Sequence, residues 1–245
     1  AWVRAICSLT RRLAVPPIRP VISLTMIPRN TLFLITALLL SSCSDPNPPS
    51  VGLYPAIQRG DIDQIKRHIH WKTDVNQVDA DGRRPLHVAA EKGRYVIVQM
   101  LVENGAEIDA PDSRGRSPLY AALMAGRTQV AELLIKQGSS FEPNLMLWRM
   151  VSEGVSDRDV IDLLMRQGAD INHLGADGNS PLTLAITGGE RVLVRQLIAR
   201  GADVNQPDAT GRWPLQLANQ AEDADIALLL KRNGAGLPAD APGKP

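Results

Sequence analysis

Apolar residues along this chain recur in adjacent pairs spaced four positions apart, which places them on one side of an α-helix. One such stripe consists of Ile97, Val98, Leu101 and Val102. The same stripe returns later in the chain as Val130-Ala131-Leu134-Ile135, Val160-Ile161-Leu164-Met165 and Leu193-Val194-Leu197-Ile198. The pattern predicts a series of short helices that bury one side each against their neighbours.

Glycine and proline divide these helices into repeated units. A glycine follows each stripe, and the separations between successive glycines are 33, 30, 33 and 33 residues, at Gly105, Gly138, Gly168, Gly201 and Gly234. A second, shorter helix is predicted before each regular stripe, because a Pro-Leu pair is typical of a helix start; these pairs begin at Pro85, Pro118, Pro181 and Pro214. A period of this length predicts a solenoid of stacked helix pairs.

Two motifs within this period resemble a known family. Residues 82–93 read GRRPLHVAAEKG and resemble the ankyrin pattern G-x-T-P-L-H-x-A-A-x-x-G, while residues 201–205 read GADVN and resemble its ending. The resemblance covers residues 52–236. It implies an all-α ankyrin-repeat solenoid of about six helix-turn-helix units joined by short β-hairpin fingers. It also implies protein binding through the fingers and inner helices, with no catalysis and no cofactor.

The first and last units differ as terminal caps should. The first unit, Leu53–Asn76, lacks the Pro-Leu start and has Lys72 where other units have glycine. His68 in its second helix is expected to be half-buried rather than functional. The last unit begins at Asp208, and its second helix is charged, as a solvent-facing cap requires.

The fourth unit is irregular. Gly126 and Gly154 are 28 residues apart where 33 are expected, so the preceding finger is five residues short and leaves a notch. The first helix there, Leu145–Val151, is bulky where other units have alanine. Two interpretations stay open: Trp148 and the methionines line a binding notch, because Met and Trp favour adaptable interfaces, or they fill the gap as core. We favour the core.

The N-terminal region predicts attachment to a bacterial envelope. Residues 26–42 contain an arginine, an apolar run too short to span a bilayer, and small residues, which is the pattern of a signal peptide. The run ends in LSSC and resembles a lipobox, which implies that Cys43 is acylated and becomes the mature N-terminus. Ser44 favours the outer membrane over the inner one. The expected location is therefore lipid-anchored and facing the periplasm, with no other membrane contact.

The remaining segments are assigned by composition. Residues 1–25 are interpreted as an upstream extension or, alternatively, as a long positively charged start of the signal peptide. Residues 43–51 are a proline-rich tether and 237–245 a flexible tail. The full sequence has 27 basic and 26 acidic residues. Removal of the five arginines before Cys43 leaves 22 basic and 26 acidic residues, a net charge of −4. The mature chain is therefore not expected to bind nucleic acid, and we expect a monomer without disulfides. Neither metal-ligand spacings nor a nucleophile motif occur in the full sequence, which has four histidines and two cysteines, so an enzyme is disfavoured.

The resemblance assigns contact positions to the fingers and the inner helices. These are Asp81, Arg83, Arg114, Arg116, Asp177, Asn179 and Arg212 in the fingers, and Glu91, Lys92, Met124 and Gln220 on the inner helices. The interpretation of the notch as a binding site adds Trp148. The arginines are expected to be exposed finger-tip cations, which predicts a protein partner with an acidic patch. The alternative function is an immunity protein that neutralises a secreted toxin enzyme through the same surface.

Overall fold

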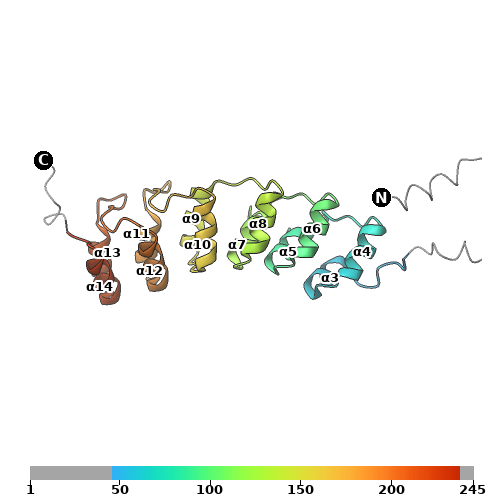
Figure 1. Ribbon diagram of the computed structural model, residues 1–245, viewed down its shortest axis with the longest axis horizontal. Helices are drawn as coiled ribbons and strands as arrows, with labels where there is room; N and C mark the ends of the chain where they lie inside the picture. Colours follow the sequence, from blue (N-terminus) through green and yellow to red (C-terminus); the bar gives the residue numbers. More distant parts are fainter. Residues whose placement is uncertain (1–45, 238–245) are drawn as a thin grey trace, which may run out of the picture. The chain divides into compact units, whose positions relative to one another are not determined.

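The computed structural model describes residues 46–237. The predicted extension 1–25, the signal peptide 26–42 with Cys43, and the tail beyond Leu237 lie outside the described residues. Within this part the chain forms twelve α-helices and no β-strand, arranged as successive pairs in a row (Figure 1). The predicted all-α solenoid of six units is confirmed.

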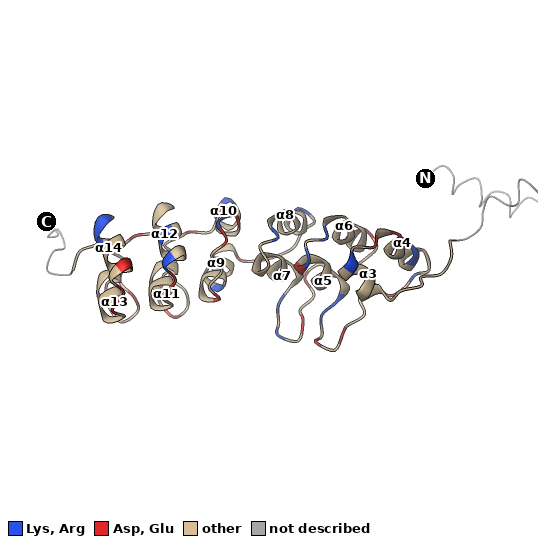
Figure 2. Cartoon of the chain, turned by 90° about the horizontal axis from the view of Figure 1, so that it is seen from below, with Lys and Arg blue, Asp and Glu red and all other residues tan. Residues whose placement is uncertain are grey.

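Each pair consists of one inner and one outer helix. The inner helices are α3 (Leu53–Arg59), α5 (Pro85–Glu91), α7 (Pro118–Met124), α9 (Pro143–Ser152), α11 (Pro181–Thr187) and α13 (Pro214–Gln220). The outer helices are α4 (Ile62–His70), α6 (Tyr95–Glu103), α8 (Thr128–Lys136), α10 (Arg158–Arg166), α12 (Arg191–Ala199) and α14 (Ala224–Arg232). Figure 2 shows the two rows, with the fingers before α5 and α7 projecting from the inner row.

Local sequence signals start the helices where the period predicts. Ser117 and Ser180 precede the prolines of α7 and α11, and each hydroxyl accepts a hydrogen bond from a backbone N–H three residues later. Asp157 and Asp223 do the same for the outer helices α10 and α14. These side chains satisfy N–H groups that have no partner inside the helix.

The helices pack on their neighbours around one continuous core. Inner helices contact inner helices and outer helices contact outer helices along most of the row, as α5 does with α7 and α6 with α8. Ala89, Ala90 and Ala122 are fully buried, so small side chains allow the inner helices to approach closely. The apolar stripes predicted from sequence lie mostly in this core, as a solenoid requires.

The first unit is closed at its N-terminal end by the tether. Gln64 exchanges two hydrogen bonds of 3.0 Å with the backbone N–H and hydroxyl of Ser50. His68 Nε2 lies 2.7 Å from the Val51 carbonyl, and its Nδ1 lies 3.0 Å from Thr73 Oγ1. His68 is therefore buried rather than half-buried, and it holds the tether onto α4.

The fingers are hairpin turns, and the fourth unit lacks one. Four fingers are closed by a backbone N–H to carbonyl bond across residues 79–83, 112–116, 175–179 and 208–212. Residues 137–142 instead join α8 directly to α9, and α9 has ten residues where each of the other inner helices has seven. Met146 and Met150 are buried in the core, as the favoured interpretation predicted, whereas Trp148 is half-buried.

Candidate interaction surface

One inner-helix position connects the first two units to the fingers that follow them. The position lies six residues before the residue with positive φ in the turn between the inner and outer helix of each unit. In chain order it is occupied by Tyr54, His87, Tyr120, Trp148, Thr183 and Gln216. Tyr54 Oη lies 2.7 Å from the Arg83 carbonyl, and His87 Nε2 donates to the Arg116 carbonyl at 2.9 Å. Two fingers are thereby held against the inner helices, so fingers and helices form one surface.

His87 keeps its ring neutral in this role. Its Nδ1 accepts a hydrogen bond of 3.2 Å from the Arg84 backbone N–H, so the ring proton lies on Nε2. Burial lowers the pKa of His87, and the bond to the Arg116 carbonyl opposes that effect only in part. The imidazole is therefore a structural link rather than a proton donor to a ligand.

Three fingers contain an internal ion pair, which we call the finger clip. In each, the aspartate that opens the finger pairs with the arginine that closes it, at Nη2 to Oδ2 distances of 2.9, 2.8 and 2.7 Å, in Asp79–Arg83, Asp112–Arg116 and Asp208–Arg212. The arginine Nε donates to the same carboxylate oxygen, at 2.8 to 3.0 Å. Such two-point pairs fix geometry as well as charge.

The clips correct the expectation that these arginines are free finger-tip cations. The aspartate side chains of Asp112 and Asp208 are 3% and 2% exposed, and Arg83, Arg116 and Arg212 lie across them. Arg83 additionally contacts Asp81 at 3.4 Å and Glu91 at 3.6 Å. The charges of Arg83, Arg116 and Arg212 are therefore compensated by their own aspartates, which leaves little basis for inferring an acidic patch on the partner.

The clips also predict loss of stability in acid. Burial alone would raise the pKa of Asp208, but bonds from Thr210 and Arg212 outweigh it and lower the pKa to about 2. The pKa values of Asp79 and Asp112 are lowered in the same way. A carboxyl with a folded pKa below its unfolded value stabilises the fold above about pH 4, and this stabilisation, about 2 kcal/mol for Asp208, disappears as the pH falls toward 2. Thermal melts from pH 7 to pH 2 should show this decline, with a shallower slope for Asp208→Asn; an equal slope would contradict it.

A hollow of about 310 Å³ lies between the fingers 79–83 and 112–116, with α5 and α7 as its floor. It brings together four predicted contact residues, which are Arg83, Glu91, Arg116 and Met124. Its floor includes Tyr120, whose hydroxyl donates to Glu153 Oε1 at 3.0 Å and whose ring faces Arg149 at 5.3 Å. The finger that would normally cover Tyr120 is the missing one.

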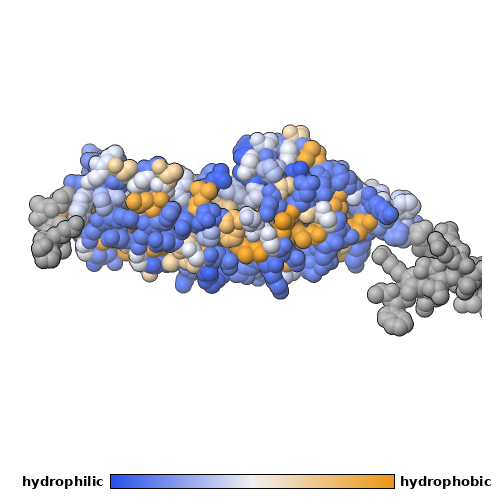
Figure 3. Space-filling model, turned by 90° about the horizontal axis from the view of Figure 1, so that it is seen from above, coloured by the Kyte–Doolittle hydropathy of each residue, from blue (hydrophilic) through white to orange (hydrophobic). Residues whose placement is uncertain are grey.

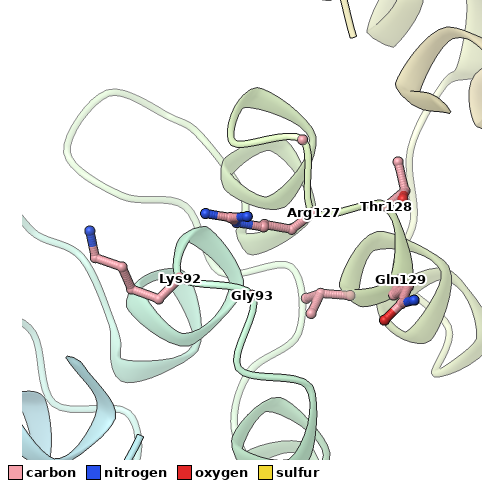
Figure 4. Close-up of a pocket in the computed structure, with 7 residues that line it drawn as sticks. Lys92, Gly93, Arg127, Thr128 and Gln129 are labelled. Atoms are coloured by element: carbon pink, nitrogen blue, oxygen red, sulfur yellow. The ribbon is translucent and has the colours of Figure 1, made fainter. Parts of the chain in front are cut away.

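Other predicted residues lie outside this hollow. Lys92 lines a second hollow of about 330 Å³ together with Arg127, whose side chain extends over Gly93 (Figure 4). Arg114 is exposed and forms no ion pair within the described part of the chain. Gln220 is exposed at the end of α13. The surface does not collect all predicted residues at one place.

The predicted notch is a third hollow, of about 370 Å³, between α9 and the finger 175–179. Its lining is Glu142, Asn144, Leu145, Trp148, His173, Gly175, Ala176 and Asp177. Trp148 packs directly on Gly175, because a Cβ added to that glycine would overlap the indole nitrogen and lie 2.6 Å from Cδ1. The indole N–H is buried there without a hydrogen-bond acceptor among residues 46–237.

Sequence reasoning missed that this finger has no clip. Gly175 and Asn179 stand where the other fingers have aspartate and arginine, although the backbone still closes with a 3.0 Å bond from the Gly175 N–H to the Asn179 carbonyl. Asp177 instead accepts hydrogen bonds of 3.1 and 2.8 Å from the backbone and side chain of Asn179. The signal was present in the sequence as the change from D-x-x-G-R to G-x-x-G-N.

Two further kinds of site are not found in the described part of the chain. Residues 46–237 contain no group of three or more histidine, cysteine, aspartate or glutamate side chains placed to hold a metal ion. None of the helices over the same residues has the length and apolarity to span a bilayer. The face in Figure 3 is mainly hydrophilic with small, separate apolar patches.

Comparison with known proteins identifies the same repeats. A family model described as "Ankyrin repeats (3 copies)" matches residues 53–145 and 147–239. The potassium channel KOR1 of Oryza sativa subsp. japonica is 41% identical over 56 residues, which are 23% of this chain and 6% of the channel. Human ankyrin repeat domain-containing protein 39 is 36% identical over 58 residues, 24% of this chain and 32% of that protein. The chain therefore spans only a minor part of these curated relatives.

Solved structures match over a larger share of the chain. The ankyrin repeat domain of human ASB11 is 26% identical, with a TM-score of 0.62, over 77% of this chain and 86% of that one. A chain from the complex of a Bdellovibrio bacteriovorus predatory endopeptidase with its immunity protein is 24% identical, with a TM-score of 0.59. That match covers 75% of this chain and 98% of the other, and it shows similarity of fold alone.

Proposed function

The chain belongs to the ankyrin-repeat family, and we propose that it is a non-catalytic scaffold that binds a protein partner while a lipid on Cys43 holds it to the bacterial envelope. The partner would bind through the fingers and inner helices. The observation that carries this proposal is that Tyr54 and His87 fasten two fingers to the inner helices. A surface that is ordered before binding loses less conformational entropy when a partner binds.

The binding proposal is tested by site-specific cross-linking in the full chain. A photo-reactive phenylalanine analogue replaces Met124 in the hollow between the fingers, or Lys92 at the end of α5. Both positions should give an adduct with the same protein in a Gram-negative host. The matched control places the analogue at Lys136, which is exposed on the outer helix α8. Adducts from Lys136 alone would place the partner on the outer face and refute the proposal.

Envelope anchoring leads to a second prediction. Cys43→Ala removes the sulfur that would carry the lipid, so the protein should be lost from the outer-membrane fraction. Loss from the outer membrane should be nearly complete, because Cys43 is the predicted point of lipid attachment. Fractionation of a Gram-negative host and immunoblotting measure the distribution. Cys7→Ala is the matched control and should fractionate as the wild type does; retention of Cys43→Ala in the outer membrane would refute the anchor.

The alternative function, an immunity protein that neutralises a secreted toxin enzyme, uses the same surface. The fold is compatible with it, since a chain of this fold occurs in the endopeptidase complex described above. The two functions differ in what the cross-linked partner does. If that partner is an enzyme and the purified chain inhibits it at a one-to-one ratio, the immunity function is supported; unchanged activity of the partner supports the scaffold.

A further inference from the structure

We propose that the notch beside Trp148 receives an apolar segment of the protein partner that carries a lysine or arginine. The inference rests on the proposed function, because it concerns where and by what chemistry that partner is held. It replaces the acidic partner expected from the sequence with a segment of opposite charge.

The notch is produced by coordinated changes in two neighbouring units. The link between α8 and α9 contains no finger, so nothing from that side covers α9. Trp148 occupies the position that His87 and Tyr54 occupy in regular units, and its indole lies where a clip aspartate would otherwise stand. Gly175 and Asn179 replace both members of that clip, which makes room for the ring. A tryptophan in the usual unit would collide with the following finger.

The walls of the notch are apolar. Leu145, in the first turn of α9, is 55% exposed and presents an apolar side chain to solvent. The half-buried side chain of Trp148 and the methyl group of Ala176 also line the notch. Aromatic and aliphatic side chains around a small hollow are typical of the anchor points of protein interfaces.

The charge of the notch is negative. Glu142 lies on one side and Asp177 on the other, both are exposed, and neither forms an ion pair within residues 46–237. No lysine or arginine lines the hollow. The nearest cation in sequence, Arg149, faces the Tyr120 ring on α7 instead. A cationic side chain placed here would meet two carboxylates beside an indole ring, and aromatic rings attract cations.

A carboxylate in the same place would be repelled. Like charges facing each other across an interface weaken association, whereas opposite charges favour the correct partner and accelerate its approach. The clips contribute to this selection because they leave Arg83, Arg116 and Arg212 compensated by their own aspartates. The uncompensated carboxylates beside the apolar wall of this notch therefore favour a cationic segment.

The experiment uses a library of random twelve-residue peptides displayed on phage and selected on the full chain. Enriched peptides should carry lysine or arginine next to an apolar residue, and their dissociation constants are then measured by fluorescence anisotropy. Glu142→Gln combined with Asp177→Asn should weaken binding about tenfold, and Leu145→Ala should weaken it severalfold. Binding should also weaken with salt, because the charges are exposed.

The control variant Glu103→Gln combined with Glu222→Gln changes the net charge equally at exposed positions away from the notch. Its affinity for the selected peptides should stay within about twofold of the wild type. Enrichment of acidic peptides, or equal affinity of both double variants, would overturn the notch proposal. The proposed function is tested separately, because it fails if cross-linking at Met124 and Lys92 gives no adduct with a partner. If adducts form there but the notch variants do not change peptide affinity, only the notch proposal is refuted.

Discussion

Charge reversal of the three clip arginines, as Arg83→Glu, Arg116→Glu and Arg212→Glu together, should remove a large part of the stability of the repeat array and lower its melting temperature strongly. Each change removes a two-point ion pair and brings a second carboxylate next to a carboxylate already held in the finger. Loss of one partner from a buried pair costs about 3–5 kcal/mol. These arginines are 31%, 35% and 47% exposed, so water screens part of that cost.

A discounted cost of about 1–3 kcal/mol for each finger is still large in sum, because domains of this size are stable by about 5–15 kcal/mol in total. The damage should extend beyond the fingers. Tyr54 and His87 bond to the carbonyls of Arg83 and Arg116, so a distorted finger also releases the inner helix before it. In a solenoid, such loosening weakens the contact between neighbouring units, on which stability depends.

Thermal and urea unfolding measure the effect, and Arg114→Glu provides the control. Arg114 lies in the same finger as Arg116 and is exposed, but it is not part of the clip. Its reversal should change the free energy of unfolding by no more than about 0.5 kcal/mol. A triple variant that melts like the wild type would mean that the arginines are free finger-tip residues after all, as the sequence alone suggested.

The clip illustrates what the sequence revealed and what it did not. The period of 33 residues, the Pro-Leu starts and the glycines predicted six helix pairs, because each of these signals acts within a few residues of its own position. The aspartate and arginine of a clip are also only four residues apart. Their pairing was missed because a finger was interpreted as a row of separate tips, whereas a tight turn brings its first and last residues together.

Contacts between units were harder to predict. The missing finger followed from the 28-residue spacing between Gly126 and Gly154, and the burial of Met150 followed from its helical position. The contact of Trp148 with Gly175 joins residues 27 positions apart, and it depends on how one unit stacks on the next. No local pattern encodes that distance. The partner-binding roles of the predicted surface residues remain predictions for the same reason, since they depend on a second molecule.

The coupling between Trp148 and Gly175 gives the second large prediction. Gly175→Ala should lower the free energy of unfolding by about 1–3 kcal/mol, because the new methyl group overlaps the indole and packed interiors resist added volume. The backbone of Gly175 is not in the left-handed region, so this cost is steric and not conformational. Gly188→Ala is the matched control. Its new methyl group would approach the Leu184 carbonyl no closer than 3.4 Å, and its stability should change by no more than about 0.5 kcal/mol.

A double-mutant cycle separates the steric contact from a general effect of the substitution. Trp148→Thr installs the residue that Thr183 supplies at the equivalent position of the next unit, and by itself it should cost about 2–3 kcal/mol through lost packing. In that background Gly175→Ala should become nearly neutral, which corresponds to a coupling energy of about 1–3 kcal/mol. Urea unfolding of the four proteins measures it. Equal costs of Gly175→Ala in both backgrounds would show that the ring and the glycine are not a matched pair, and the notch would then be an accident of the short link between α8 and α9 rather than a site shaped by two adjoining units.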